Sequence, residues 1–392
     1  MHMVLPDVAL AAVGARGFGV YVHVPFCARR CGYCDFNTYT PAESGLRGGY
    51  IDALLGEAQR AALVLGGAGP PLVETVFFGG GTPTLLPAAD LGRVLERLDR
   101  LWGLASDAEV TTEANPESVS PATLRALRAA GFTRLSVGMQ SVAPHVLALL
   151  DRRHEPGQAL AAVEAARAAG FDHVNLDLIY GTPGETPEDF AGSLAAAVNA
   201  GVDHVSAYAL IIEEGTPLAA RMARGEVPYP DDDVAADRYL AAEEALSAAG
   251  FSWYEVSNWA RGVSGRCRHN LGYWRGADWW GFGAGAHSHL GGVRWWNVAR
   301  PGDYRDRLAR GLPVVAGSET LTEADRQVET VLLGVRLAEG LPAGALRGPA
   351  AAEAEAAVAE GLLDAGAWRV GRAVLTVRGR LLADAVVRRL LP

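Results

Sequence analysis

The sequence predicts an α/β protein: a partial barrel of six β/α units, followed by a smaller α+β region at the carboxyl end. Short runs of β-type residues alternate with alanine- and leucine-rich stretches of helical period up to about residue 217. After that point the alternation stops and the composition changes. Repeated strand-helix units predict a parallel sheet, because parallel strands need long crossover connections that are usually helical.

The predicted strands are short and rich in valine, leucine and aromatic residues. Stretches such as PATLRALRAAG and PGQALAAVEAARAAG lie between them, and each ends at a glycine, a common residue after the last turn of a helix. The six predicted strands span residues 19–24, 74–78, 108–113, 134–138, 173–179 and 204–210.

Three regions are predicted along the chain. Residues 1–217 form the partial barrel, and residues 218–318 form a connecting helix and a tryptophan- and glycine-rich segment. Residues 319–392 are predicted as three helices, two short strands and a closing helix, an order typical of a winged-helix-like domain. Such domains often bind DNA, but the net charge of −10 makes nucleic acid an unexpected partner. We therefore expect a packing or partner-binding role for this region.

The composition narrows the function further. Hydrophobic residues make up 49% of the chain and charged residues 20%, which is typical of a soluble globular protein. The sequence contains no lysine, which excludes a lysine Schiff base and a P-loop. It shows neither a signal-peptide pattern nor an apolar run of about 18 residues. We expect a cytoplasmic protein without a transmembrane segment, whose membrane association, if any, is through partners.

Three of the four cysteines lie directly after the first predicted strand, as Cys27, Cys31 and Cys34 in a C-x3-C-x2-C pattern. Clustered thiols in a chain otherwise poor in cysteine predict a metal site. Zinc and iron-sulfur clusters usually take four ligands, so three thiolates leave one position open. That position is filled by a histidine such as His23 in a zinc site, or by a bound cofactor in a [4Fe-4S] site.

Further motifs follow the other predicted strands. GGGTP (79–83), EANP (113–116), GMQS (138–141) and DLIYGTPGET (177–186) each lie at or near the end of a strand. The carboxyl ends of the strands in such a barrel share one face, where catalytic loops collect. The sequence therefore predicts a functional site on that face, next to the cysteines.

The C-x3-C-x2-C pattern, with Tyr33 just before the last cysteine, resembles the signature of radical SAM enzymes. In those enzymes the open iron of a [4Fe-4S] cluster binds S-adenosylmethionine. The stretches YVHVPFC, FGGGTPT, EANP, GMQS, LDLIYGTPGET and YEVSNWA resemble the branch that contains oxygen-independent coproporphyrinogen III oxidase and the heme chaperone related to it. The resemblance implies that Cys27, Cys31 and Cys34 hold the cluster.

The same resemblance implies the residues around S-adenosylmethionine. Glycines after a strand allow close approach of the backbone, and carboxylates and arginine suit ribose hydroxyls and a methionine carboxylate. The implied cofactor-binding residues are Tyr21, Tyr33, Gly80, Gly81, Thr82, Glu113, Gln140, Arg152 and Asp177.

Two departures from the oxidase pattern favour the chaperone. Phe36 stands where the oxidase has a further cysteine, and only 20 residues precede Tyr21, fewer than in the oxidase. In addition, CRHNLGYW (267–274) resembles the H-N-x-x-Y-W motif of the chaperone, and five tryptophans fall within 274–296. The resemblance implies heme binding by His269, Asn270, Tyr273 and Trp274. His287, His289 and Cys267 are the alternative iron ligands.

The sequence thus predicts a radical SAM heme chaperone that binds a [4Fe-4S] cluster, S-adenosylmethionine and heme, and transfers heme to acceptor hemoproteins such as respiratory enzymes. Cleavage of S-adenosylmethionine is expected to accompany or regulate that transfer. One alternative is an oxygen-independent coproporphyrinogen III oxidase, which decarboxylates its substrate to protoporphyrinogen IX. Another is a zinc-stabilised protein with a DNA-binding winged helix.

Overall fold

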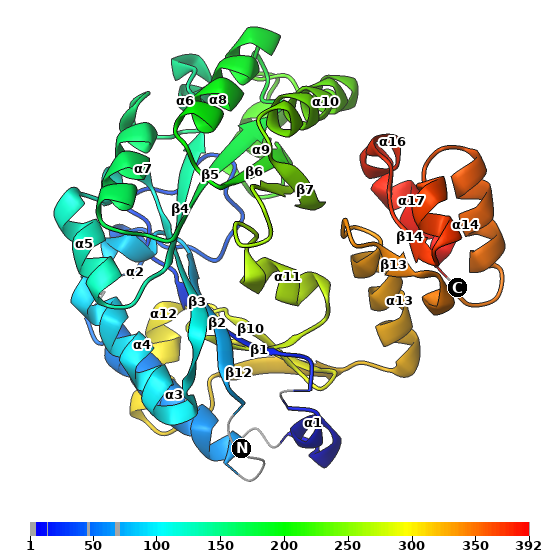
Figure 1. Cartoon of the computed structure of the whole chain (residues 1–392). Helices are drawn as coiled ribbons and strands as arrows, with labels where there is room; N and C mark the ends of the chain where they lie inside the picture. The colour runs from blue at the N-terminus through cyan, green and yellow to red at the C-terminus, as the bar shows by residue number, and fades with distance from the viewer. Residues whose placement is uncertain (1–4, 14, 45–47, 67–70, 392) are drawn as a thin grey trace.

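The computed structural model describes residues 5–13, 15–44, 48–66 and 71–391. Its centre is a curved sheet of twelve strands in the order β12-β11-β10-β9-β1-β2-β3-β4-β5-β6-β8-β7, with β12 and β7 at its two edges (Figure 1). The first six strands are parallel neighbours in chain order, which confirms the predicted partial barrel. These strands are β1 (Phe18–Val24), β2 (Val73–Gly80), β3 (Leu104–Ala114), β4 (Arg134–Gln140), β5 (His173–Tyr180) and β6 (His204–Ala209).

Helices cover the outer face of this parallel part (Figure 1). In α4, Leu91, Val94 and Leu98 are buried at helical spacing, while Arg93 on another side is half-exposed and pairs with Asp52 and Asp90. Ser120, Thr186, Thr216 and Asp231 begin helices by accepting backbone N–H groups with their side chains. The helices of this region are α1 (Asp7–Ala11), α2 (Pro41–Ser44), α3 (Tyr50–Leu65), α4 (Ala88–Trp102), α5 (Pro121–Ala129), α6 (Pro144–Leu149), α7 (Gln158–Ala168), α8 (Pro187–Asn199), α9 (Pro217–Ala223) and α10 (Asp232–Ala248).

The tryptophan- and glycine-rich segment continues the same sheet. Strand β9 (Asp278–Phe282) lies parallel to β1, and β10 (His287–Leu290), β11 (Val293–Asn297) and β12 (Val315–Thr320) follow in antiparallel order. At the other edge, β7 (Ser252–Glu255) and β8 (Asn258–Ala260) extend the sheet beyond β6. Helix α11 (Arg268–Trp274) lies inside the curve against β1 and β2, and α12 (Pro301–Ala309) packs on α3 (Figure 1).

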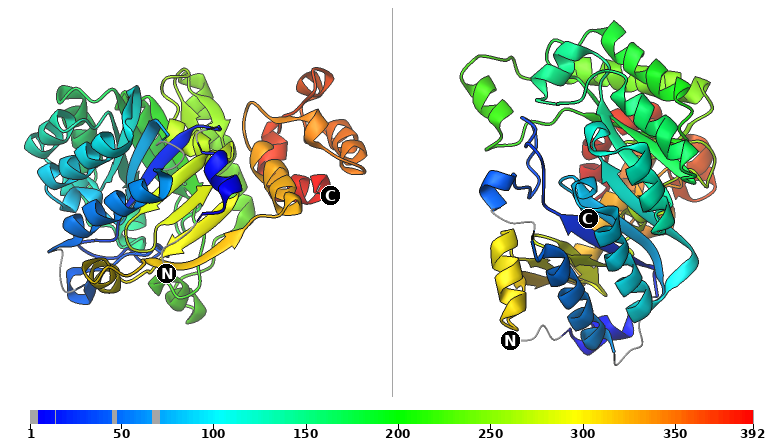
Figure 2. Two further views of the ribbon diagram at one scale, coloured as in Figure 1. Left: turned by 90° about the horizontal axis from the view of Figure 1, so that it is seen from below. Right: turned by 90° about the vertical axis from the view of Figure 1, so that its left-hand side faces the viewer.

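The carboxyl end forms a small unit with its own apolar core, beside the sheet (Figure 2). The sequence predicts two consecutive strands near its end, but the structure differs. One two-residue strand, β14 (Arg372–Ala373), pairs with the distant β13 (Leu341–Pro342), and two helices follow it. A strand of two residues is too short to show the alternation of apolar and polar residues by which a strand is recognised in sequence. The helices are α13 (Glu323–Gly334), α14 (Ala350–Ala359), α15 (Ala365–Arg369), α16 (Val377–Leu381) and α17 (Ala383–Leu390).

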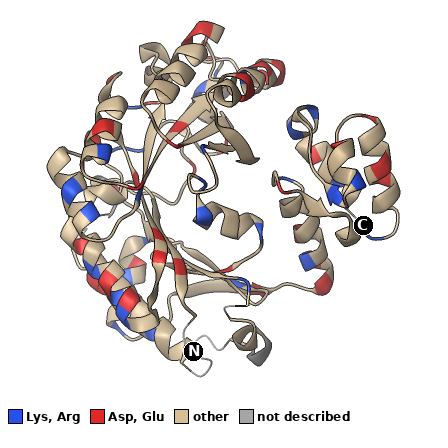
Figure 3. Ribbon diagram, viewed as in Figure 1, with Lys and Arg blue, Asp and Glu red and all other residues tan. Residues whose placement is uncertain are grey.

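Charged residues of both signs are interspersed along the outer helices (Figure 3). Arg100 pairs with Glu96 on α4, and Arg128 pairs with Asp172 between neighbouring units. Within the described residues, no helix has the length and apolar character that crossing a lipid bilayer requires.

Candidate functional site

The loop after β1 closes on itself around the cysteines. The Cys27 N–H donates to the Tyr39 carbonyl over 3.1 Å, and the Tyr39 N–H donates to the Pro25 carbonyl over 2.7 Å. Cys27 is buried, whereas Cys31 and Cys34 are partly exposed, and all three are free thiols. The loop therefore carries the three cysteines beyond the carboxyl end of β1.

The glycines after β2 bring its backbone against the cysteine loop. The Gly81 N–H donates to the Val24 carbonyl and the Thr82 N–H to the Phe26 carbonyl, each over 2.8 Å. A Cβ atom on Gly81 would lie 2.6 Å from the Phe26 carbonyl oxygen, which is closer than two such atoms can approach. Glycine is therefore required at this position.

Arg152 connects the cysteine loop to the ends of β3 and β4. Its guanidinium donates to Asn115 Oδ1 over 2.8 Å, to the Gly138 carbonyl over 2.9 Å and to Cys31 Sγ over 3.5 Å. The Asn115 amide in turn donates to Thr82 Oγ1 over 2.9 Å. The Nε atom of Arg152 is buried and has no partner in the described structure, so the guanidinium retains one donor.

Gln140 lies beside Arg152 because β4 ends irregularly. Its φ is 63°, in the left-handed region, and the pairing of β4 with β5 shifts between Gly138 and Gln140. A Cβ on Gly138 would come within 2.9 Å of Gln140 Nε2 and 3.2 Å of Arg152 Nη2. Both side chains therefore pack directly against this glycine. Bulges of this kind redirect side chains next to functional sites.

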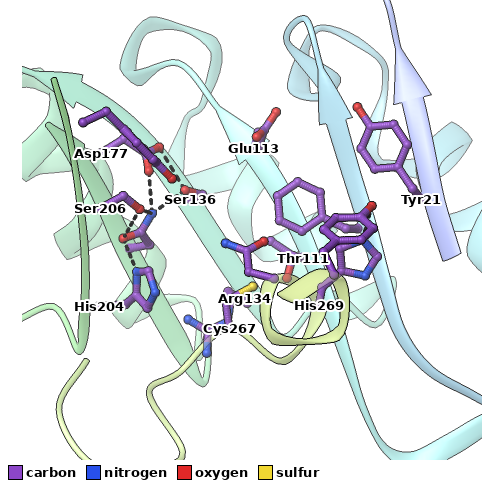
Figure 4. A pocket seen from close by; sticks show the side chains of 15 residues that line it. Tyr21, Thr111, Glu113, Arg134, Ser136, Asp177, His204, Ser206, Cys267 and His269 are labelled. Atoms are coloured by element: carbon purple, nitrogen blue, oxygen red, sulfur yellow. Dashed lines mark hydrogen bonds between the residues drawn. The ribbon is translucent and has the colours of Figure 1, made fainter. Parts of the chain in front are cut away.

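A polar cavity of about 200 Å³ lies inside the curve of the sheet, and Glu113 and Asp177 both line it (Figure 4). Glu113 Oε2 accepts the Gly80 N–H over 3.0 Å, while Asp177 accepts from Ser136 over 3.0 Å and from Asn175 over 2.7 Å. Burial, reinforced by the nearby Asp177, raises the pKa of Glu113 to about 7. Burial also raises the pKa of Asp177. Two carboxyl groups are thus available as acceptors or donors for a polar ligand.

The two predicted tyrosines lie in different surroundings. Tyr21 lines the polar cavity, and its hydroxyl lies 2.9 Å from His23 Nδ1. Tyr33 is partly buried against an apolar cluster that includes Ile179 and Leu218, and burial raises its pKa. Both phenols therefore stay protonated at neutral pH.

The surroundings of His23 and Cys27 bear on which metal the three cysteines could hold. Among the described residues, no three His, Cys, Asp or Glu side chains converge into a ready-made metal-binding group. His23 has both ring nitrogens engaged, Nδ1 with Tyr21 and Nε2 with the Asn37 carbonyl at 2.9 Å, and does not serve as a fourth zinc ligand. Burial raises the pKa of Cys27 to about 11, so binding iron at this thiol releases a proton.

Helix α11 contains the H-N-x-x-Y-W residues and places them on different sides. Asn270 and Tyr273 line the polar cavity, whereas Trp274 packs against a small apolar cluster with Tyr254 and Leu337. His269 also lines that cavity, so three of the four predicted heme residues share one space and only Trp274 faces another.

His269 is held as a packed core residue. Its Nδ1 lies 2.8 Å from Thr75 Oγ1 and its Nε2 lies 2.9 Å from the Tyr273 hydroxyl. The ring stacks on Phe77 with centroids 5.2 Å apart. Burial lowers the pKa of His269 to about 4, so the ring is neutral at physiological pH. Neither ring nitrogen is free for iron without the loss of a hydrogen bond.

A buried ion pair anchors the start of α11. Glu109 accepts the Arg268 N–H over 3.1 Å and the His269 N–H over 3.0 Å, and Arg134 Nε donates to it over 3.1 Å. Arg134 also donates to the carbonyls of Gly265 and Arg266, each over 3.0 Å. Burial acts to raise the pKa of Glu109, but Arg134 and the backbone donors hold it below its usual value. The pair fixes the helix relative to β3 and β4.

A larger cavity, of about 660 Å³, adjoins the polar one and shares Tyr21, Glu113 and Tyr273 with it. Its volume lies in the range of small-molecule and cofactor sites, roughly 300–1,000 Å³. The remaining lining residues come from the end of β1, the cysteine loop, the end of β2, strands β9 to β11 with the turns on either side of β9, and helix α13. They are His23, Phe36, Asn37, Gly80, Gly276, Trp279, Gly285, His287, His289, Arg294, Glu329 and Leu333.

Comparison with known proteins identifies the family. Residues 21–197 match the model of the radical SAM superfamily. The chain is 56% identical to the Mycobacterium tuberculosis protein named heme chaperone HemW, over 97% of both chains. It is 35% identical to the Bacillus subtilis protein of the same name, over 82% of this chain and 84% of that one.

The chain belongs to the HemW family of radical SAM proteins. A mouse relative named radical S-adenosyl methionine domain-containing protein 1, mitochondrial, is 41% identical over 69% of this chain and 60% of its own length. Among solved structures, the coproporphyrinogen III oxidase HemN from Escherichia coli covers 98% of this chain and aligns over 92% of its own, with a TM-score of 0.81 and 24% identity. That likeness confirms the fold predicted from the sequence. Membership of the superfamily implies a [4Fe-4S] cluster and S-adenosylmethionine.

Three residues of this HemW-family site are not predicted from the sequence. Asn115, between Arg152 and Thr82, lies in the EANP motif, which identifies its place but not its contacts. Glu109 and Arg134 each interrupt a predicted strand with a charge, and both are nearly fully buried. Opposite charges on neighbouring parallel strands were the available signal for this pair, since a buried charge requires a partner.

Proposed function

We propose that this protein is a heme chaperone of radical SAM type, which binds heme and delivers it to acceptor hemoproteins such as respiratory enzymes. The observation that supports this most is the 56% identity to the M. tuberculosis heme chaperone over 97% of both chains. Phe36 in place of a further cysteine and the HNLGYW stretch of α11 agree with it. We also propose that the protein works in the cytoplasm.

The cofactor arrangement we propose follows the geometry above. Cys27, Cys31 and Cys34 would hold the [4Fe-4S] cluster, which would offer a binding position for S-adenosylmethionine and, after reduction by an external electron donor, the electron for its reductive cleavage. Around that position, Arg152 and Asn115 offer a donor and an acceptor between the cysteine loop and β3. The remaining proposed contacts are Tyr21, Tyr33, Gly80, Gly81, Thr82, Glu113, Gln140 and Asp177.

The test is anaerobic reconstitution with iron and sulfide, followed by titration with heme and by transfer to an apo-hemoprotein. A saturable heme absorption band, and loss of that band as the acceptor gains heme, would support the proposal. A protein that takes up no heme at micromolar concentrations would refute it.

The same preparation tests the oxidase alternative. We expect no protoporphyrinogen IX from coproporphyrinogen III in the presence of reductant and S-adenosylmethionine. Its formation would identify the chain as an oxidase, and zinc without iron or sulfide in the purified protein would instead favour the zinc-stabilised alternative.

A further inference from the structure

One face of β9 to β11 forms a wall of the larger cavity. His287 and His289 lie two residues apart on β10 and therefore face the same side of the sheet. Trp279 on β9 pairs with His289 from one neighbouring strand, and Arg294 on β11 pairs with it from the other. These four residues all line the cavity. The opposite face is the buried one, with side chains in the main core: Trp280, Leu290, Val293 and Trp295.

Of the two histidines on this wall, His289 is the oriented one. Its Nδ1 lies 3.1 Å from the Ala277 carbonyl, and its ring lies against Trp279 with centroids 5.2 Å apart. Its Nε2 has no hydrogen-bond partner among the described residues. An imidazole that binds a metal through one nitrogen normally donates from the other to a carbonyl or carboxylate, which fixes the ring. His289 has this arrangement before any metal is bound.

His287 and His269 do not have one ring nitrogen held by a carbonyl and the other free. The His287 side chain is exposed and stacks on Trp296 with centroids 5.8 Å apart, and no hydrogen bond within the described structure orients its ring. His269 has both nitrogens occupied by Thr75 and Tyr273.

A third cavity, of about 360 Å³, adjoins the larger cavity and shares four lining residues with it: His289, Gly276, Glu329 and Leu333. Its lining includes Arg16, Arg275, Arg326 and Arg372 with Glu329 and Glu339. Arg16 pairs with Asp278 and Arg275 pairs with Glu339, whereas Arg326 and Arg372 form no ion pair among the described residues. Heme combines a flat apolar ring with two carboxylates at one edge. An aromatic cavity beside an arginine-lined one is complementary to both parts.

We propose that His289 is the axial ligand of heme iron in the larger cavity, with the carboxylates toward the arginine-lined cavity. The proposal rests on the proposed function and deepens it by naming the ligand and the wall that holds the cargo. Because the same cavity includes Gly80 and Glu113, the cargo lies next to the proposed S-adenosylmethionine site. His269 is then a positioning residue that fixes α11 behind the site.

The test compares three variants of the reconstituted full-length chain: His289→Gln, His287→Gln and His269→Gln. Each is titrated with ferric heme, with the heme-free sample subtracted from the spectrum, and its folding is checked by thermal melting. For His289→Gln we expect a shifted heme absorption band and a heme affinity at least about tenfold weaker. His287→Gln tests the rival ligand on the same wall, and His145→Gln, at a residue that lies outside these cavities, is the control that should keep the band of the unmodified protein. A further variant, His289→Ala, should regain that band when free imidazole is added.

The outcomes separate the two proposals. An unmodified protein that binds no heme overturns both. Heme binding by the unmodified protein, with an unchanged band and affinity in His289→Gln, overturns the ligand assignment alone. Loss of the band in a folded His269→Gln or His287→Gln, with His289→Gln unaffected, transfers the assignment to that histidine.

Discussion

At the scale of single residues, Gly81 sets how closely β2 approaches the cysteine loop. Gly81→Ala places a methyl group 2.6 Å from the Phe26 carbonyl oxygen, so one backbone must move. We expect the loop to shift, the protein to lose about 1–3 kcal/mol of stability, and cluster reconstitution to fall. Iron and sulfide per chain after reconstitution, with a melting curve, measure both effects.

Gly56→Ala is the matched control, because a Cβ atom at Gly56 in α3 meets no atom within 4 Å. It should leave the iron content unchanged and preserve or slightly raise stability, since alanine favours helix. Normal iron content in Gly81→Ala would show that the close backbone contact is unnecessary for the cluster.

Glu113, in the polar cavity, makes the stability of the folded protein depend on pH. Its folded-state pKa of about 7 lies above the usual 4.5, so the folded protein binds more protons than the unfolded chain between these values. The stability from its protonated form is therefore fully present below pH 4.5 and is lost as the pH rises through 7. As the pH rises from 5 to 8, the free energy of unfolding should fall in both proteins. The fall should be smaller in Glu113→Gln than in the unmodified protein, by about 1–3 kcal/mol.

Urea unfolding of the cofactor-free chain at both pH values measures this difference. Glu96→Gln, which removes an exposed carboxylate on α4, controls for the change in net charge. An identical pH dependence in Glu113→Gln and the unmodified protein would mean that Glu113 ionises without cost inside the cavity.

At the scale of elements, helix α11 depends on a buried ion pair that belongs to other strands. Glu109→Gln removes the charge that Arg134, at 1% exposure, requires, and it turns an amide toward the backbone N–H groups of α11. Breaking a buried pair from one side costs about 3–5 kcal/mol. We expect a lower melting temperature and faster amide hydrogen exchange over residues 267–274.

The exposed pair between Arg128 and Asp172 provides the comparison. Asp172→Asn should change stability by about 0–1 kcal/mol and leave exchange in α11 unaltered. Equal exchange in Glu109→Gln and Asp172→Asn would show that packing alone holds the helix.

The elements also show where prediction from sequence ended. Strands β1 to β6 were predictable because each is a β-rich run between glycine-ended helices. The end of the chain was not, because β13 and β14 have two residues each and pair across 30 residues of sequence. The cysteine loop and the motifs after the strands were placed correctly at one edge. The separation of Tyr273 from Trp274 was not foreseen, since neighbours in a motif point in different directions on a helix.

At the scale of the whole molecule, Arg380 joins the carboxyl-terminal unit to the barrel. Its side chain, 5% exposed, donates to Glu243 over 2.8 Å and lies 4.4 Å from the Trp253 ring centroid. Arg380→Ala should loosen this contact and expose the chain between α12 and α13 to protease. Limited proteolysis, with the cleavage sites mapped by mass spectrometry, measures the rate.

Arg389→Ala is the matched control, because Arg389 pairs with Glu353 and Glu360 inside the same unit. It should not change cleavage between the two parts. If both variants were cut at the rate of the unmodified protein, Arg380 would not hold the parts together.

The pairing of β1 with β9 brings together segments about 260 residues apart, with Phe18 opposite Asp278. During synthesis the ribosome releases β1 long before its neighbour exists, so the nascent chain has an open strand edge until β9 emerges. The wall with His289 and Leu333 is completed last. The cysteine loop also waits for late segments, because the Asn37 amide donates to the carbonyls of Ala284 and Ala299, each over 3.0 Å. A chain truncated before β9 therefore lacks both the second edge partner of β1 and the late contacts of the cysteine loop.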